Sequence, residues 1–288
     1  MPPLFSLTLA LYAASCTLYF VAVAQPRLVW PQRLAVLLLL LGLLGQGADI
    51  AWLCLHGQHP GSSAREALFL ASFLMLGILP VRTFRQPLPL LGALLLPVAM
   101  VIDVVVRVLP RATALALPGG EGSSAAPRFV HILSATLGIA LFGVAAAASV
   151  AYMLNERRLK RRRPQRGVNL SRGPSLETLD AWNQQGIVFG LLAFTAALVS
   201  GTFWLLAAPL PGRLPAEPGL VLQAQRLLSQ PRYTLAVITW LLFAGLLVGR
   251  IVLGLRGRFT AQLTLVGFWT SLGVLVIYLF RDQAGQRP

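Results

Sequence analysis

Three histidines, His56, His59 and His131, are the side chains of this sequence best suited to bind a metal. A neutral imidazole can ligate haem iron, and an arginine fork pairs well with a carboxylate such as a haem propionate. Arg128 precedes His131 by three residues and would share its helix face. These residue types are chemically compatible with a haem site that uses two of the histidines on the iron and Arg128 or Arg65 on the propionates. The alternative is that the histidines lie at the membrane interface and bond to loop backbone.

Two other groups of polar residues are weaker candidates. His56 and His59 form a possible metal pair, although no carboxylate or cysteine cluster joins them. Asp49 and Asp103 fall inside apolar segments, where acids are costly and often functional. Arg107 follows Asp103 by four residues and is its expected partner, whereas Asp49 has none in sequence and could relay protons or be buried against another helix.

The composition of the chain indicates whether these residues belong to a soluble protein or to a membrane protein. Of 288 residues, 56% are hydrophobic and only 11% are charged, against about 25% charged in a typical globular chain. Mean hydropathy is +0.73. We therefore expect a polytopic membrane protein rather than a soluble enzyme. The absence of a phosphate loop, a metalloprotease motif or a serine elbow from the sequence argues further against an enzyme.

The apolar segments predict the architecture. A membrane about 30 Å thick needs about 20 apolar residues per helix. We expect an all-α, polytopic membrane helix bundle that forms a single integral membrane domain over residues 1–288. Its eight predicted spans are 4–24, 34–55, 66–81, 88–107, 129–153, 186–208, 233–254 and 260–280.

Basic residues predict the orientation of the bundle. Lys and Arg number 24 against nine Asp and Glu, and the linker 154–185 is strongly basic. Basic loops stay on the cytoplasmic side, which would put both termini and all three histidines outside. The linker is also expected to contact anionic lipid of the bilayer, and not nucleic acid.

Several segments, in order, resemble the CcsA/HemX-like cytochrome c assembly family of haem-handling membrane proteins. Residues 59–70 (HPGSSAREALFL) resemble the family's H-F-P-x-S-N-x-Y-E-S-L-x-F-L segment. The HIL triplet at 131–133 and the basic exit at 155–160 (NERRLK) are similar to its central helix. Three further segments also resemble the family: 175–180 (SLETLD), 239–244 (TWLLFA) and 254–258 (GLRGR).

The resemblance implies haem as cofactor, cytochrome c maturation proteins as partners and a bacterial inner membrane as location. Two of the family's histidines are present, His59 and His131, and the resemblance implies that they bind the haem iron. The chain lacks the family's tryptophan-rich W-G-x-Y-W-x-W-D loop in 209–232, and Arg250 stands near the place of a late histidine in the seventh span. It therefore looks like a divergent, HemX-type member with an accessory or regulatory role. Two other functions stay open: a small permease that uses Asp49 or Asp103, and a scaffold that recruits a partner through its basic linker.

Overall fold

The computed structural model describes residues 4–56, 64–83, 88–108, 125–161, 174–207 and 229–284. Every element in these ranges is an α-helix, which confirms the predicted all-α class. The helices are α1 (Phe5–Ala24), α2 (Trp30–Leu55), α3 (Ala64–Thr83), α4 (Pro89–Val108), α5 (Ala125–Arg161), α6 (Leu176–Ala207), α8 (Pro231–Val252) and α9 (Arg258–Ala284).

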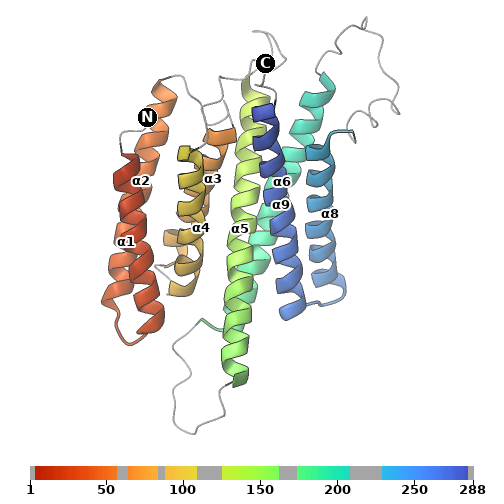
Figure 1. The fold of residues 1–288 in the computed structure, drawn as a ribbon. Helices are drawn as coiled ribbons and strands as arrows, with labels where there is room; N and C mark the ends of the chain where they lie inside the picture. The colour runs from red at the N-terminus through yellow and green to blue at the C-terminus, as the bar shows by residue number, and fades with distance from the viewer. Residues whose placement is uncertain are drawn as a thin grey trace, which may run out of the picture.

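The helices run side by side as an up-and-down bundle (Figure 1). One group consists of α1, α2, α3 and α4, and a second of α5, α6, α8 and α9. The two groups meet where α3 and α4 contact α5, and α5 with α6 forms the most extensive helix pair. The start of α1 and the end of α9 lie at the same end of the bundle, as the sequence predicts (Figure 1).

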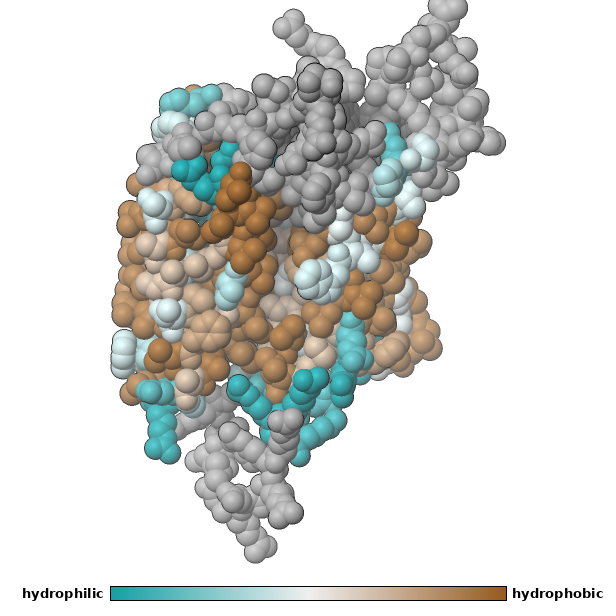
Figure 2. Space-filling model, in the orientation of Figure 1, coloured by the Kyte–Doolittle hydropathy of each residue, from teal (hydrophilic) through white to brown (hydrophobic). Residues whose placement is uncertain are grey.

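Six of the described helices are long and apolar enough to cross a membrane: α1, α2, α4, α5, α6 and α8. This confirms a multi-pass membrane protein. The helices α3 and α9 are not in this set, so the predicted total of eight spans stays a prediction. On the face that Figure 2 shows, the middle of the bundle is largely apolar, and the most hydrophilic residues lie toward its ends.

Two helices extend well beyond their predicted spans. The spans 129–153 and 186–208 correspond to α5, which continues to Arg161, and α6, which begins at Leu176. The predicted linker 154–185 is therefore helical at both of its ends. Polar residues extend these helices: Lys160 pairs with Glu156 one turn earlier at 2.6 Å, and the backbone N–H of Thr178 donates to the Ser175 hydroxyl at 3.0 Å as an N-terminal cap.

Glycines bring α5 and α6 close together. A Cβ atom at Gly190 of α6 would lie 2.7 Å from the ring of Phe142, and one at Gly138 of α5 would lie 3.1 Å from the backbone nitrogen of Phe194. Neither position has room for a larger residue, so helix contact through small residues fixes this pair. The close pair in turn aligns the side chains of the two helices that face each other.

Candidate functional site

His131 lies in the first turns of α5 and is partly buried against α6. Its Nδ1 atom is 2.7 Å from the carbonyl oxygen of Ala197. Because a carbonyl can only accept a hydrogen bond, Nδ1 must carry a proton and donate it. In the neutral ring the lone pair then belongs to Nε2, which is the nitrogen that could ligate a metal.

Two further residues of α6 complete the seat of the His131 ring. The Ser200 hydroxyl oxygen lies 3.4 Å from Nδ1. A Cβ atom at Gly201 would lie 2.6 Å from the ring carbon Cε1 and 2.9 Å from Nδ1. Only glycine at 201 leaves space for the ring in this position. Sequence reasoning missed this seat, because nothing in the order of residues shows that 197–201 faces position 131.

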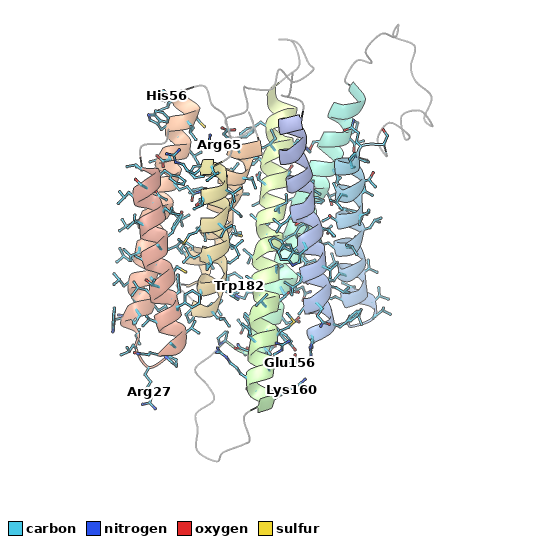
Figure 3. The ribbon with its side chains drawn as sticks, viewed as in Figure 1. Arg27, His56, Arg65, Glu156, Lys160 and Trp182 are labelled. Carbon is cyan, nitrogen blue, oxygen red and sulfur yellow. The ribbon has the colours of Figure 1, made fainter. Side chains whose placement is uncertain are left out.

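The other predicted site residues are described to different extents. His59 lies outside the described residues, so its approach to His131 stays a prediction. Arg128 belongs to α5 three residues before His131, but its side chain is also outside the described part of the chain. Arg65 begins α3, is partly buried and lies at the same end of the bundle as His56 (Figure 3).

His56 lies at the end of α2 and caps it. Its Nδ1 atom is 2.8 Å from the carbonyl oxygen of Trp52, one turn earlier. The centroids of the two rings lie 4.0 Å apart, with the ring planes tilted by 32°. His56 thus bonds to backbone, as the alternative states, but to the backbone of its own helix rather than to that of a loop. Within the described ranges, no group of three or more histidine, cysteine, aspartate or glutamate residues could hold a metal ion.

Asp103 is the centre of a buried polar cluster between four helices. Its Oδ1 atom accepts from the Ser72 hydroxyl at 2.6 Å and lies 3.4 Å from the Gln46 amide nitrogen. That amide donates to Ser72 at 2.9 Å, and its oxygen accepts from Tyr12 at 2.7 Å. Tyr12, Gln46, Ser72 and Asp103 belong to α1, α2, α3 and α4, so the cluster ties the first helix group together.

The predicted ion pair between Asp103 and Arg107 is wrong. Arg107 is exposed, and its guanidinium carbon lies 5.8 Å from the centroid of the Phe5 ring. The two residues are one turn apart in α4, but Asp103 points into the bundle while Arg107 reaches toward the helix end, as long basic side chains do in membranes.

Asp49 is also buried, as one of the predicted alternatives states. Its Oδ1 atom accepts from the backbone N–H of Leu4 at 3.0 Å, which fixes the start of α1 on α2. Its Oδ2 atom and the Thr8 hydroxyl have no hydrogen-bond partner among the described residues. Asp49 therefore has a clear structural role in joining these two helices.

A second polar centre, which sequence reasoning missed, lies near the opposite end of the bundle. Nη2 of Arg250 in α8 donates to Asp180 at 2.9 Å and to Asn183 at 2.6 Å, both in α6. Asn183 in turn donates to Ser149 of α5 at 2.6 Å and to Thr264 of α9 at 3.1 Å. The signal available in the sequence was a single arginine inside the apolar run 239–252.

Comparison with known proteins completes the description of the chain. No curated protein and no solved structure is similar enough to count as a match. The family model described as "Cytochrome C assembly protein" matches residues 62–215, more than half of the 288 residues. The matched segment contains His131 and its seat on α6. The chain is therefore a member of the cytochrome c assembly protein family.

Proposed function

We propose that this membrane protein handles haem near its external face, with His131 as an iron ligand. Family membership supports a role in membrane haem handling. The observation that carries the proposal for this residue is the hydrogen bond from Nδ1 of His131 to the Ala197 carbonyl at 2.7 Å. Metal-binding histidines commonly donate their second ring N–H to a carbonyl, which fixes both the tautomer and the ring orientation.

The chemistry of the proposed histidine and arginine residues fits haem. His131 would present Nε2 to the iron, and we propose His59 as the second ligand. Arg128 and Arg65 would pair with the propionates, because a guanidinium fork matches a carboxylate. Haem, when bound, would supply an iron that accepts nitrogen ligands. The protein's own part is to hold, orient and present it without covalent catalysis, which makes it a carrier rather than an enzyme.

The distribution of charge supports the proposed orientation. Arg27 and Lys160 lie at one end of the bundle, and His56 and Arg65 lie at the other (Figure 3). Basic residues collect on the cytoplasmic side of membrane proteins, so we assign the end with Arg27 to the cytoplasm of a bacterial inner membrane. His131 would then serve the external side, where it could meet cytochrome c maturation proteins in an accessory or regulatory role.

The family match gives no support to the permease and scaffold alternatives. Both acids that a permease would use also have structural bonds: Asp103 to Ser72, and Asp49 to the backbone of Leu4. We therefore keep haem handling as the proposed function and do not propose a second one.

Titration with haemin tests the assignment. Purified protein in detergent should develop a Soret band on addition of haemin, and His131→Ala should weaken haem affinity by about tenfold or more, as loss of a ligand and its supporting bonds implies. His56→Ala is the matched control, since it removes a histidine at the same end of the bundle that bonds to its own helix. Unchanged affinity in His131→Ala would remove this residue from the site.

The second ligand needs its own measurement. His59→Ala should keep haem on His131 but shift the Soret band toward that of a five-coordinate iron. Identical spectra for wild type and His59→Ala would show that His59 is not a ligand, and His131 could then still hold the iron alone. Absence of any haem-dependent spectrum in the wild type would contradict the proposed function as a whole.

A further inference from the structure

Arg250 is a buried cation whose donor groups are only partly used. The residue is 7% exposed, and its side chain is 4% exposed. Nη2 donates to Asp180 and Asn183 and lies 3.3 Å from the Thr260 hydroxyl. By contrast, Nε and Nη1 are buried and have no hydrogen-bond partner in the part of the chain that the structure describes.

The unpaired Nε and Nη1 donors of Arg250 would be stabilised by a hydrogen-bond acceptor. Leaving a buried donor unsatisfied costs about 1–3 kcal/mol, and more for a charged group. Asn183 holds the guanidinium in place, because its amide nitrogen is itself fixed to the Ala145 carbonyl at 3.0 Å and to Ser149 at 2.6 Å. The arrangement keeps a rigid, positively charged group in position and leaves the N–H groups of Nε and Nη1 for a group from outside these helices.

The surroundings favour an anion. Asp180 balances one positive charge through its 2.9 Å ion pair with Arg250. Arg256 and Arg258, in and just after the turn that follows α8, are both exposed and make this end of the bundle more basic. A guanidinium pairs best with the oxygens of a carboxylate or a phosphate, so an oxyanion matches both the charge and the donor geometry.

The position of Arg250 identifies the kind of anion. The residue is in the last turn of α8, which leads into the basic turn, and clustered basic residues at the end of a membrane helix attract anionic lipid headgroups. Around it the two helices expose large apolar side chains to the membrane: Ile251 is 71% exposed, Val252 72% and Phe259 56%. A phospholipid could place its phosphate at Arg250 and its acyl chains along these side chains.

The turn between α8 and α9 begins three residues after Arg250 in the sequence. Gly254 and Gly257 adopt positive φ angles of 62° and 86°, a conformation that glycine adopts without strain. A Cβ atom built at Gly254 would meet no other atom within 4 Å. The turn thus has open space beside it, and we expect the headgroup to approach from this side.

We propose that Arg250 is the base of a phosphate site that binds the headgroup of an anionic phospholipid at the basic end of the bundle. The site is separate from His131, which lies toward the opposite end. It takes no part in haem ligation, so its test does not depend on the proposed function.

Thermal unfolding of the full-length, delipidated protein in detergent measures binding. Phosphatidylglycerol should raise Tm, and diacylglycerol with the same acyl chains but no phosphate should not. Inorganic phosphate separates the two sources of the anion: no effect at millimolar concentration identifies a lipid headgroup, whereas an equal effect would overturn the lipid assignment and point to a soluble phosphate. If the wild type does not distinguish phosphatidylglycerol from diacylglycerol, the proposal is wrong whatever the variants do.

Variants then locate the site. Arg250→Lys keeps the charge that Asp180 needs but removes the guanidinium fork, so phosphatidylglycerol affinity should fall about tenfold, which corresponds to about 1.4 kcal/mol. Arg27→Lys is the matched control, an exposed arginine at the same end of the bundle but outside the site, and should stay within about twofold of wild type, as expected for a surface charge. Equal affinities of the two variants would overturn the assignment to Arg250.

Discussion

His131 donates from Nδ1 to the carbonyl oxygen of Ala197 across the α5–α6 contact, at 2.7 Å. This bond joins two residues 66 positions apart in the sequence. It sets the tautomer of the ring and therefore decides which nitrogen can act as a ligand. The chemistry of His131 thus depends on the packing of α5 against α6.

The first prediction concerns Gly201, because a Cβ there would collide with the His131 ring. Gly201→Ala should displace the imidazole and lower haem affinity by about 10–100-fold, the range seen when the supporting groups of a metal ligand are lost. The measurement is the same haemin titration. Gly245→Ala is the matched control, since a Cβ at Gly245 would have no neighbour within 4 Å. Equal affinity in both variants would show that the seat does not position the ring.

Ser72 tests the buried cluster of the first helix group. Ser72→Ala removes the 2.6 Å hydrogen bond to Asp103 and should lower the free energy of unfolding by about 1–3 kcal/mol, the cost of an unsatisfied buried acceptor. Denaturation in mixed detergent can measure this difference. Ser134→Ala provides the comparison, since within the described ranges that hydroxyl bonds to carbonyls of its own helix alone, and the stability of this variant should differ from wild type by less than about 0.5 kcal/mol.

Asn183 should be among the polar residues whose loss destabilises the second helix group most. It accepts from Arg250 and donates to residues of α5 and α9. Asn183→Ala should lower the free energy of unfolding by about 3–5 kcal/mol, as when a buried charge loses a partner. The neighbouring Gln184 is exposed, so Gln184→Ala should leave stability nearly unchanged. A small effect of Asn183→Ala would show that the network contributes little.

Reporter fusions test the orientation. A reporter inserted at residue 165 should show a cytoplasmic location, and one at residue 120 an external location, because the basic segment determines the cytoplasmic side. A silent fusion is distinguished from a reversed one by using paired reporters that are active on opposite sides. Reversal at both positions would place His131 on the cytoplasmic side and contradict the proposed external haem site.

The sequence was sufficient for the helices but not for their contacts. Apolar runs in the sequence predicted a helix at the place of every described helix, because burial of the backbone in lipid leaves helix as the main choice. Contacts between residues on neighbouring helices were harder to predict. Asp103 was paired with Arg107 by helix spacing, yet its partners Ser72 and Gln46 come from other helices. The contacts of Gly201 and Arg250 could not be predicted for the same reason, since they depend on which helix lies opposite.

The length of α5 has a mechanical consequence. Its 37 residues span about 55 Å at 1.5 Å per residue, more than the thickness of a hydrocarbon core of about 30 Å. The helix carries His131 near one end and the Glu156–Lys160 pair near the other, and it contacts both helix groups. Because α5 is one continuous helix, a tilt that starts at the His131 end also moves the Lys160 end, so haem bound as we propose would change the position of the basic end of α5.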